Sequence, residues 1–273
     1  MANSEPVVVK HVEDVQWEEA GKKGLAYLPV RRDDIGADFF GLLRFDAFVN
    51  SGVHQHRDVA MSLMLSGGLT DRDGFVPPGS MGINFNGSTH DAIAYERAYM
   101  VSRLEGPVQY LPELEHSLHV GAERTAIVVD SPEQSPDLVL ALANLPLQMT
   151  GLAGVGRKMI FDYACTPHDR RCVELQLLPG TKVSTHRLNG RVDWFVLSGD
   201  VGITAKGRTN FARTNAFVMM SPQAEVSFES RYGARLVAWA DGPSESLEPG
   251  QPHDLYGFGS LHTSRRAHKS SRA

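Results

Sequence analysis

Short apolar runs recur along most of the chain, and each is closed by residues that favour turns. The clearest runs lie at residues 7–9, 25–28, 41–45, 61–65 and 99–104. Strands of this length, about 8–12 residues apart and separated by Gly, Pro, Asn and Asp, are typical of antiparallel sandwiches and barrels. The pattern therefore predicts an all-β fold.

Residues 131–156 interrupt this rhythm. Two Ser-Pro pairs, at 131–132 and 135–136, resemble helix starts. Apolar residues then recur at helical spacing, at Leu138, Leu142 and Leu145. A short helical linker is therefore predicted over residues 126–157.

This linker divides the chain into two β domains. One is predicted over residues 1–125 and the other over residues 158–243, where strand-like runs resume near Met159. Residues 244–273 are expected to form a tail, because Pro, Ser and Glu dominate residues 243–252 and a basic, Ser-rich end follows.

The second domain repeats the first. The turn sequence Leu-Ser-Gly occurs at 65–67 and again at 197–199, and Gly-Pro occurs at 106–107 and again at 242–243. Alignment of these turns pairs His54 with His186, His56 with Leu188, and His90 with Val226. The second copy therefore has the framework without the full histidine set, so folding alone does not require three histidines there.

The composition fits a globular protein and gives no sign of nucleic-acid binding. Apolar residues make up 42% of the 273 residues, charged residues make up 22%, and the net charge is −5. The basic cluster at 265–272 is predicted to be a disordered end, since nucleic-acid-binding domains carry a basic stripe over a folded face. No run approaches the roughly 18 apolar residues of a membrane span.

The cysteines and the N-terminus favour a cytoplasmic location. Cys165 and Cys172 do not predict a disulfide, because a single bridge in a chain of this size without an export signal is uncommon. Residues 1–15 are acidic and lack the apolar core of a signal peptide. A reducing compartment is therefore expected.

His54 and His56 are the residues best suited to chemistry. Alternate side chains of a strand project from the same face, so the two imidazoles would point together into the interior. Neutral ring nitrogens are common ligands for zinc, iron and copper. The alternative is that an isolated His-x-His pair lies on the surface of an edge strand.

The segments around these histidines resemble the cupin superfamily. They are Gly52 ahead of His-x-His, the closing pair Gly67-Gly68, Pro-Pro-Gly at 77–79, and Gly-Ser-Thr-His ending at His90. The chain is most similar to the subgroup that holds the zinc-binding cupins of anti-sigma factors and the dioxygenases that cleave acetylacetone and dihydroxyacetophenone. The resemblance covers residues 24–107 and 159–243 and implies two tandem cupin barrels, each a double-stranded β-helix or jelly roll.

One departure from the superfamily pattern concerns the metal ligands. Cupins usually place a glutamate ligand at the position of Ala60. The resemblance therefore implies three neutral ligands, His54, His56 and His90, as in the diketone-cleaving enzymes that use ferrous iron. Asp58 shares the strand parity of His54 and His56 and is a further candidate ligand. Fe²⁺ is the expected cofactor, and Zn²⁺, Ni²⁺ or Mn²⁺ would fit the same ligands.

Other residues near the motif have candidate supporting roles. Ligand histidines normally donate their second N–H to an acceptor, and the polar residues near the motif in sequence are Asn84, Asn86, Glu96 and Arg57. An apolar pocket, or ordinary core, is the expected role of Met61, Met64, Met81, Phe75 and Phe85. No catalytic residue is predicted beyond the metal ligands.

The resemblance implies a metal-dependent enzyme. A divalent ion with three neutral ligands keeps its full charge and accepts a bidentate anion such as a β-dicarbonyl enolate. The expected function is therefore a non-haem iron dioxygenase, an oxidoreductase that cleaves a small diketone or a hydroxylated aryl ketone with O₂.

Two alternatives from other classes stay open. One is a non-catalytic zinc-binding or regulatory cupin of the anti-sigma-factor type, and the other is a sugar- or seed-type binding bicupin without chemistry. The expected partners are a small-molecule substrate and O₂, with no nucleic acid and no membrane. A homodimer through an edge strand is also expected.

Overall fold

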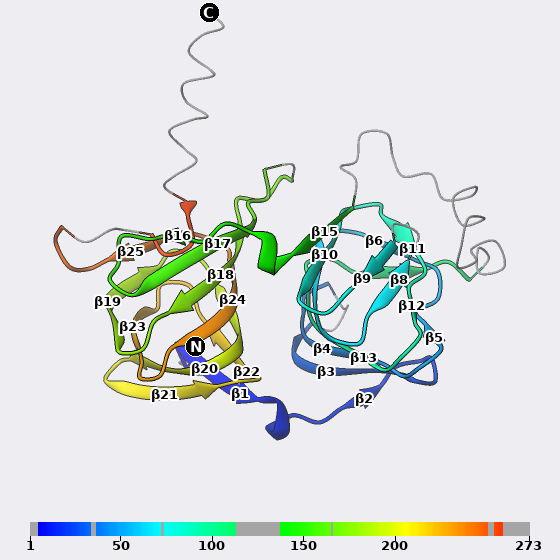
Figure 1. The fold of residues 1–273 in the computed structure, drawn as a ribbon, viewed down its shortest axis with the longest axis horizontal. Coiled ribbons are helices and arrows are strands. Elements are labelled where there is room, and N and C mark those ends of the chain that lie inside the picture. Colours follow the sequence, from blue (N-terminus) through cyan, green and yellow to red (C-terminus); the bar gives the residue numbers. More distant parts are fainter. Residues whose placement is uncertain are drawn as a thin grey trace, which may run out of the picture. The chain divides into compact units, whose positions relative to one another are not determined.

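The computed structural model describes residues 5–33, 37–71, 74–112, 137–164, 166–250 and 254–258. Within these ranges the regular elements are β-strands and two 3-10 turns, so the predicted all-β class is confirmed. The chain forms two compact units (Figure 1). We call Val15–Asn144 the N-terminal barrel, and Met1–Asp14 together with Leu145–Ala273 the C-terminal barrel.

The N-terminal barrel is built from three curled sheets. The largest runs β15-β10-β7-β13-β4-β3-β2 and is flanked by the three-stranded sheet β11-β6-β14 and the four-stranded sheet β5-β12-β8-β9. The strands are β2 (Glu18–Glu19), β3 (Leu25–Arg32), β4 (Phe39–Phe45), β5 (Val49–Asn50), β6 (His54–His56), β7 (Ala60–Ser66), β8 (Leu69–Asp71), β9 (Gly74–Val76), β10 (Ser80–Asn84), β11 (Thr89–His90), β12 (Ile93–Ala94), β13 (Ala98–Leu104), β14 (Val108–Tyr110) and β15 (Leu138–Ala141).

The C-terminal barrel is one continuous sheet in which β16-β17-β18-β24-β20-β23-β19-β25 are successive neighbours. Strands β21 and β22 pair with β20 beside this path. The strands are β1 (Val7–His11), β16 (Gln148–Met149), β17 (Val155–Phe161), β18 (Arg171–Leu177), β19 (Thr181–Leu188), β20 (Val192–Ala205), β21 (Arg208–Arg213), β22 (Ala216–Met220), β23 (Glu225–Ser230), β24 (Ala234–Ala240) and β25 (Ser244–Ser246).

Each barrel includes one strand that directly precedes the other barrel in the sequence. Strand β1, near the N-terminus, pairs with β22 of the C-terminal barrel, from Val7 opposite Met220 to His11 opposite Ala216. Strand β15 pairs in the same way with β10 of the N-terminal barrel. A 3-10 turn follows each exchanged strand, at Val12–Asp14 and at Leu142–Asn144. The boundaries of the two units therefore differ from the predicted domains 1–125 and 158–243.

The predicted helical linker is wrong over its described part. Residues 137–157 contain β15, a single 3-10 turn, β16 and the start of β17. Leu138 pairs with Ile83 of β10, and Leu142 is buried after the strand has ended. Apolar residues four apart fit a strand followed by a turn as well as a helix, and backbone pairing with β10 decided between them. Residues 126–136 lie outside the described ranges.

The predicted tail is also wrong at its start. Ser244–Ser246 forms β25, which pairs with β19, and Leu255, Tyr256 and Phe258 are buried in the C-terminal core. The Asp254 carboxylate accepts hydrogen bonds from the backbone N–H groups of Ser244, Tyr256 and Phe258. The Pro, Ser and Glu content reflects turns between folded pieces. Residues 251–253 and 259–273, with the basic cluster, are outside the described part of the chain.

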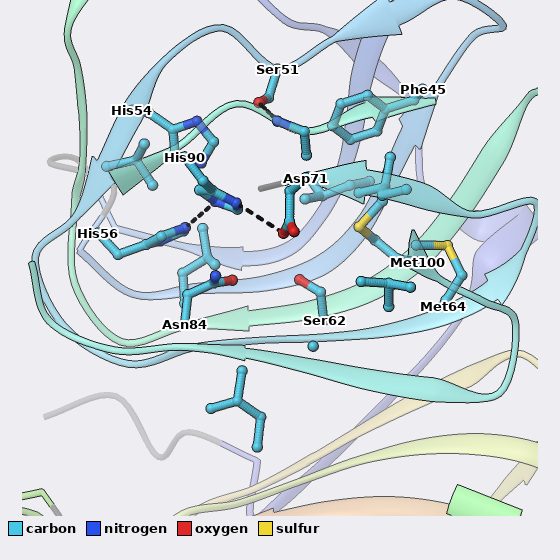
Figure 2. A pocket seen from close by; sticks show the side chains of 18 of the residues that line it. Phe45, Ser51, His54, His56, Ser62, Met64, Asp71, Asn84, His90 and Met100 are labelled. Atoms are coloured by element: carbon cyan, nitrogen blue, oxygen red, sulfur yellow. Dashed lines mark hydrogen bonds and ion pairs between the residues drawn. The ribbon is translucent and has the colours of Figure 1, made fainter. Parts of the chain in front are cut away.

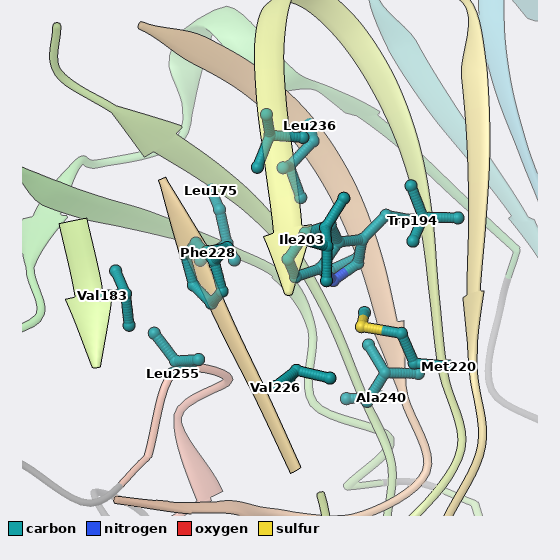
Figure 3. Packing of buried hydrophobic residues seen from close by; sticks show 14 of the residues in the cluster. Leu175, Val183, Trp194, Ile203, Met220, Val226, Phe228, Leu236, Ala240 and Leu255 are labelled. Carbon is teal, nitrogen blue, oxygen red and sulfur yellow. The ribbon is translucent and has the colours of Figure 1, made fainter. Parts of the chain in front are cut away.

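The strand register confirms the predicted repeat. His54 lies opposite His90 on one neighbouring strand and opposite Tyr110 on the other. In the second barrel His186 lies opposite Val226 and Ser246 at the same two places. The interior of the C-terminal barrel is a packed apolar cluster that includes Trp194, Ile203 and Phe228 (Figure 3). Among the described residues, no helix has the length and apolar character that crossing a membrane would require.

Candidate metal centre

Three histidines converge inside the N-terminal barrel (Figure 2). His54 and His56 project from the same face of β6, and His90 lies directly opposite His54 on β11. Their exposed fractions are 8%, 6% and 8%, and one nitrogen from each lies within 4.8 Å of the others. The predicted convergence of these three residues is therefore confirmed as geometry, and the surface alternative is excluded by their burial.

A hydrogen-bonded loop orients His54. The Asp91 carboxylate accepts the Gly52 N–H at 3.1 Å and the Asn50 side-chain amide at 3.1 Å. Gly52 has a φ of 80°, a conformation that favours glycine, and its carbonyl accepts the His54 Nδ1–H at 2.8 Å. The proton on Nδ1 leaves Nε2 as the lone-pair nitrogen. Asp91 and Gly52 thus present His54 in the form that a metal requires.

A carboxylate orients His90. The Nδ1 of His90 lies 3.3 Å from an oxygen of Asp71, so Nδ1–H donates to Asp71 and Nε2 carries the lone pair. Asp71 belongs to β8 and is nearly buried, with 12% of its side chain exposed. Asp71 was not among the site residues predicted from the sequence. The pairing across 19 residues of sequence had no local signal.

The distance between two ring nitrogens tests the fit of a metal ion. Nε2 of His56 lies 3.0 Å from Nε2 of His90. Two lone pairs at this distance repel unless a proton or a cation lies between them. Nitrogens each about 2.1 Å from one ion, at a right angle, would be about 3.0 Å apart. The separation of His56 and His90 therefore fits a shared divalent transition metal, and His54 lies close enough to complete the ligand set.

His54 and His56 are held neutral by their surroundings. Burial lowers the pKa of His54 to about 3, and the nearby His90 adds to this effect. Burial also lowers the pKa of His56 well below its usual range, again with His90 contributing. Because a ligand nitrogen must be unprotonated, these two residues are ready to bind a cation at neutral pH.

A second carboxylate holds the loop between β10 and β11. Asp137 accepts the backbone N–H of Phe85 at 3.1 Å and the Asn84 amide at 3.1 Å, and it also accepts the Ser88 hydroxyl. Asp137 directly precedes the exchanged strand β15. It lay in the predicted linker, so sequence reasoning missed it. The exchanged strand therefore supports the segment that leads to His90.

The other predicted site residues lie in different places. Asn84 lines the pocket beside the histidines, where its amide donates to Asp137. Asp58 is half-buried in the turn after β6, and its carboxylate accepts the next backbone N–H, that of Val59, at 2.8 Å. Asn86, Glu96 and Arg57 are exposed. The pocket lining does not include Asp58, Asn86, Glu96 or Arg57. Strand parity misplaced Asp58, because β6 ends at His56.

The histidines form one wall of a cavity of about 350 Å³. Its other walls are mainly apolar and include Leu25, Phe45, Met64, Val76 and Met100, which also belong to a buried core cluster. Met64 thus lines the pocket, one of the two roles predicted for it, and Met100, which was not predicted, lies beside it. The site can bind a metal and present it to a small, largely apolar molecule.

Comparisons with known proteins agree with this geometry. Residues 5–109 match the family model of the ChrR cupin-like domain. A Nostoc punctiforme protein, for which dioxygenase activity has been suggested, superposes with a TM-score of 0.68 at 10% identity, covering 86% of this chain and 82% of that one. Bacillus subtilis oxalate decarboxylase, in work on its Mn(II) centres, gives 0.61 at 13% identity and covers 88% and 79%. No curated protein matched in a sequence search. At these identities the structures show a shared fold alone.

Proposed function

We propose that the N-terminal barrel, where residues 5–109 match the family model of the ChrR cupin-like domain, is a metal-dependent cupin dioxygenase. The metal is Fe²⁺ held by His54, His56 and His90, and the substrate is a small diketone or a hydroxylated aryl ketone cleaved with O₂. The observation that carries this proposal is the convergence of three buried, inward-facing imidazoles on one point.

The donor set favours an anionic, chelating substrate. Ferrous iron in this site would supply Lewis acidity and one-electron chemistry toward O₂. Three neutral imidazoles leave the ion's charge uncompensated, and the position where cupins usually carry a glutamate is the buried Ala60 of β7. Asp71 holds His90, the Gly52 carbonyl holds His54, and mainly apolar walls line the rest of the cavity.

The experiment is anaerobic loading of the full chain with Fe²⁺, followed by O₂-uptake measurements with a panel of diketones and hydroxylated aryl ketones. We expect uptake that depends on both iron and substrate, and none from His90→Val. Zinc-loaded protein is the matched redox-silent control. Absence of uptake with every substrate and with iron, manganese and nickel would contradict the proposal.

A second function is supported by the family match. The ChrR cupin-like domain aligns with residues 5–109, and the subgroup resemblance includes zinc-binding regulatory cupins. In this alternative, the same three histidines hold Zn²⁺ and no reaction occurs. Elemental analysis of protein purified without chelators separates the two functions: zinc at one ion per chain, with no O₂ uptake after iron loading, supports the regulatory function.

Assembly and location belong to the proposal as well. We retain the homodimer, a cytoplasmic location, and a small molecule with O₂ as the partners. Light scattering of the purified chain measures its mass in solution against the 29.9 kDa of one chain. A monomer at all concentrations would remove the dimer from the proposal without affecting the metal centre.

A further inference from the structure

The pocket changes character with distance from the histidines. Figure 2 shows Asp71 between His90 and a group formed by Phe45, Met64 and Met100. The side chains of this group are 4%, 2% and 2% exposed, so they form a closed, apolar end. The other end is open, because Tyr110 at the rim is 58% exposed. A ligand on the metal would therefore extend into an apolar dead end.

Small side chains keep this space open. Ser62 of β7, Gly82 of β10 and Ala92 of the β11–β12 connection line the pocket. The strand registers place Trp194, Val218 and Phe228 at the matching positions of the C-terminal barrel, where all three belong to the packed core. The same framework therefore fills its interior when these positions are large, and opens it when they are small.

The charges along the pocket limit the charge of a ligand. Arg32 is the one cation among the described residues that line it. Its guanidinium lies 3.1 Å from the Glu18 carboxylate and 5.3 Å from the Tyr27 ring, so its charge is already balanced. The two carboxylates of the lining, Asp71 and Asp137, add negative charge. A second anionic group on a ligand would meet these acids without a cation to balance it.

Resting on the proposed function, we propose that the substrate is a singly charged chelator with an uncharged, apolar tail, and that dicarboxylates and acid-tailed diketones are excluded. The chelating head occupies the metal beside the histidines. The tail passes Asp71 and lies against Met64, Met100 and Phe45. Flexible thioether side chains suit a range of apolar tails, so the site selects for the absence of tail charge more than for exact shape.

The test compares three probes with the same head on the zinc-loaded full chain, by calorimetry. They are acetylacetone, heptane-2,4-dione and 4,6-dioxoheptanoate, which replaces the end of the heptanedione tail with a carboxylate. We expect heptanedione to bind about 15-fold more tightly than acetylacetone, at roughly fourfold per buried methylene. The dioxoheptanoate should bind at least about tenfold more weakly than heptanedione, because its carboxylate would be buried without a partner.

Two variants locate the effect. Met100→Ala should reduce the preference for heptanedione, whereas Leu236→Ala, the same truncation at the matching position of the C-terminal barrel, should leave it unchanged. Leu69→Lys places a cation at a half-buried position of the pocket lining. This variant should reduce the difference in affinity between 4,6-dioxoheptanoate and heptane-2,4-dione. If Met100→Ala does not fold, Leu69→Lys still tests whether a carboxylate on the tail is excluded because no cation balances it.

The outcomes separate this inference from the function on which it rests. If the three probes bound with equal affinity, or if 4,6-dioxoheptanoate bound more tightly than heptane-2,4-dione, the proposal of an uncharged, apolar tail (the tail rule) would be overturned. The metal site would then still stand as a site that binds chelating ligands. Failure of the protein to bind zinc, or of any probe to bind the zinc-loaded protein, would overturn the proposed function and the tail rule together.

Discussion

The two barrels differ at a few inward-facing positions on a shared framework. His54 and His186 occupy the same register position, and each donates its Nδ1–H to the carbonyl two residues earlier, in both cases at 2.8 Å. His186 is fully buried, and its Nε2 has no hydrogen-bond partner among the described residues. The C-terminal barrel therefore keeps one imidazole in the orientation of a ligand, without the other two.

In the C-terminal barrel, apolar residues take the places of the other inward-facing residues, so its interior is a packed core where the N-terminal barrel has a pocket. Leu188, Val226 and Ile203 stand at the places of His56, His90 and Asp71, and all three belong to the apolar cluster. Trp194 packs edge-on against Phe228, with ring centroids 5.3 Å apart, where the other barrel has small residues. The comparison shows that the fold tolerates either interior, so folding alone does not require the histidine set of the N-terminal barrel.

The largest effect is expected when His90 is replaced by valine, the residue at the matching position of the C-terminal barrel. His90→Val removes one of the three histidines, together with the Nδ1–H that Asp71 accepts. We expect metal content to fall from about one ion per chain to near zero, since two imidazoles hold a divalent ion weakly. The measurement is elemental analysis after dialysis. His186→Leu is the matched control and should leave metal content unchanged, and equal loss in both variants would contradict the assignment of the site.

The second-largest effect is expected from the opposite substitution, which gives the C-terminal barrel a small residue of the N-terminal barrel. Trp194→Ser would open a cavity among Ile203, Phe228 and Val226. Deletion of a buried tryptophan costs about 3–5 kcal/mol of unfolding free energy, and the new hydroxyl adds to that cost. Urea unfolding followed by circular dichroism measures the loss. Metal binding by the N-terminal barrel should persist in native conditions, and a loss of metal together with stability would show that the barrels are not independent in this respect.

A smaller effect is expected at Asp71. Asp71→Asn keeps an acceptor for His90 Nδ1–H but removes the charge, and Asp71→Ile copies the matching residue Ile203. Removal of such an orienting partner typically costs about 10–100-fold in metal affinity. Competition with a chelator of known affinity measures the change. We expect Asp71→Ile to lose more than Asp71→Asn, and unchanged affinity in both would show that His90 needs no orienting acceptor.

A further expected effect is a pH dependence of stability that the buried histidines of the N-terminal barrel should produce. The pKa of His54 is lowered to about 3 and that of His56 is lowered well below its usual range, whereas both approach about 6.5 in the unfolded chain. Unfolding therefore takes up protons below pH 6.5. The metal-free protein should keep its full stability above about pH 6.5 and lose up to about 1.4 kcal/mol per pH unit for each histidine below it.

The measurement is the urea midpoint of metal-free protein between pH 7.5 and 4.5. His56→Leu, the residue of the second barrel, should flatten the profile by about 1 kcal/mol per pH unit. A profile with the same slope in both proteins would mean that His56 is not buried in its neutral form.

Local pattern placed two of the three histidines together, and the resemblance to cupins added His90 as the third candidate ligand. Period-two alternation placed His54 and His56 on one face, and the turn sequences of the repeat paired His90 with Val226, as the register confirms. The same reasoning failed at Leu138 and Leu142, because a four-residue spacing of leucines fits either a helix or a short strand with a turn. It also failed for Leu255 and Tyr256, whose burial depends on the rest of the barrel.

By itself the sequence determined the all-β class, the repeated framework and the three histidines, since strand alternation, turn residues and motif spacing are properties of neighbouring residues. Only the tertiary structure decided that β1 and β15 each complete the other half's barrel, that Asp71 and Asp137 support the site, and that one interior is open while the other is filled. These outcomes depend on contacts between segments far apart in sequence and on the combined volume of side chains that meet only after the sheets close.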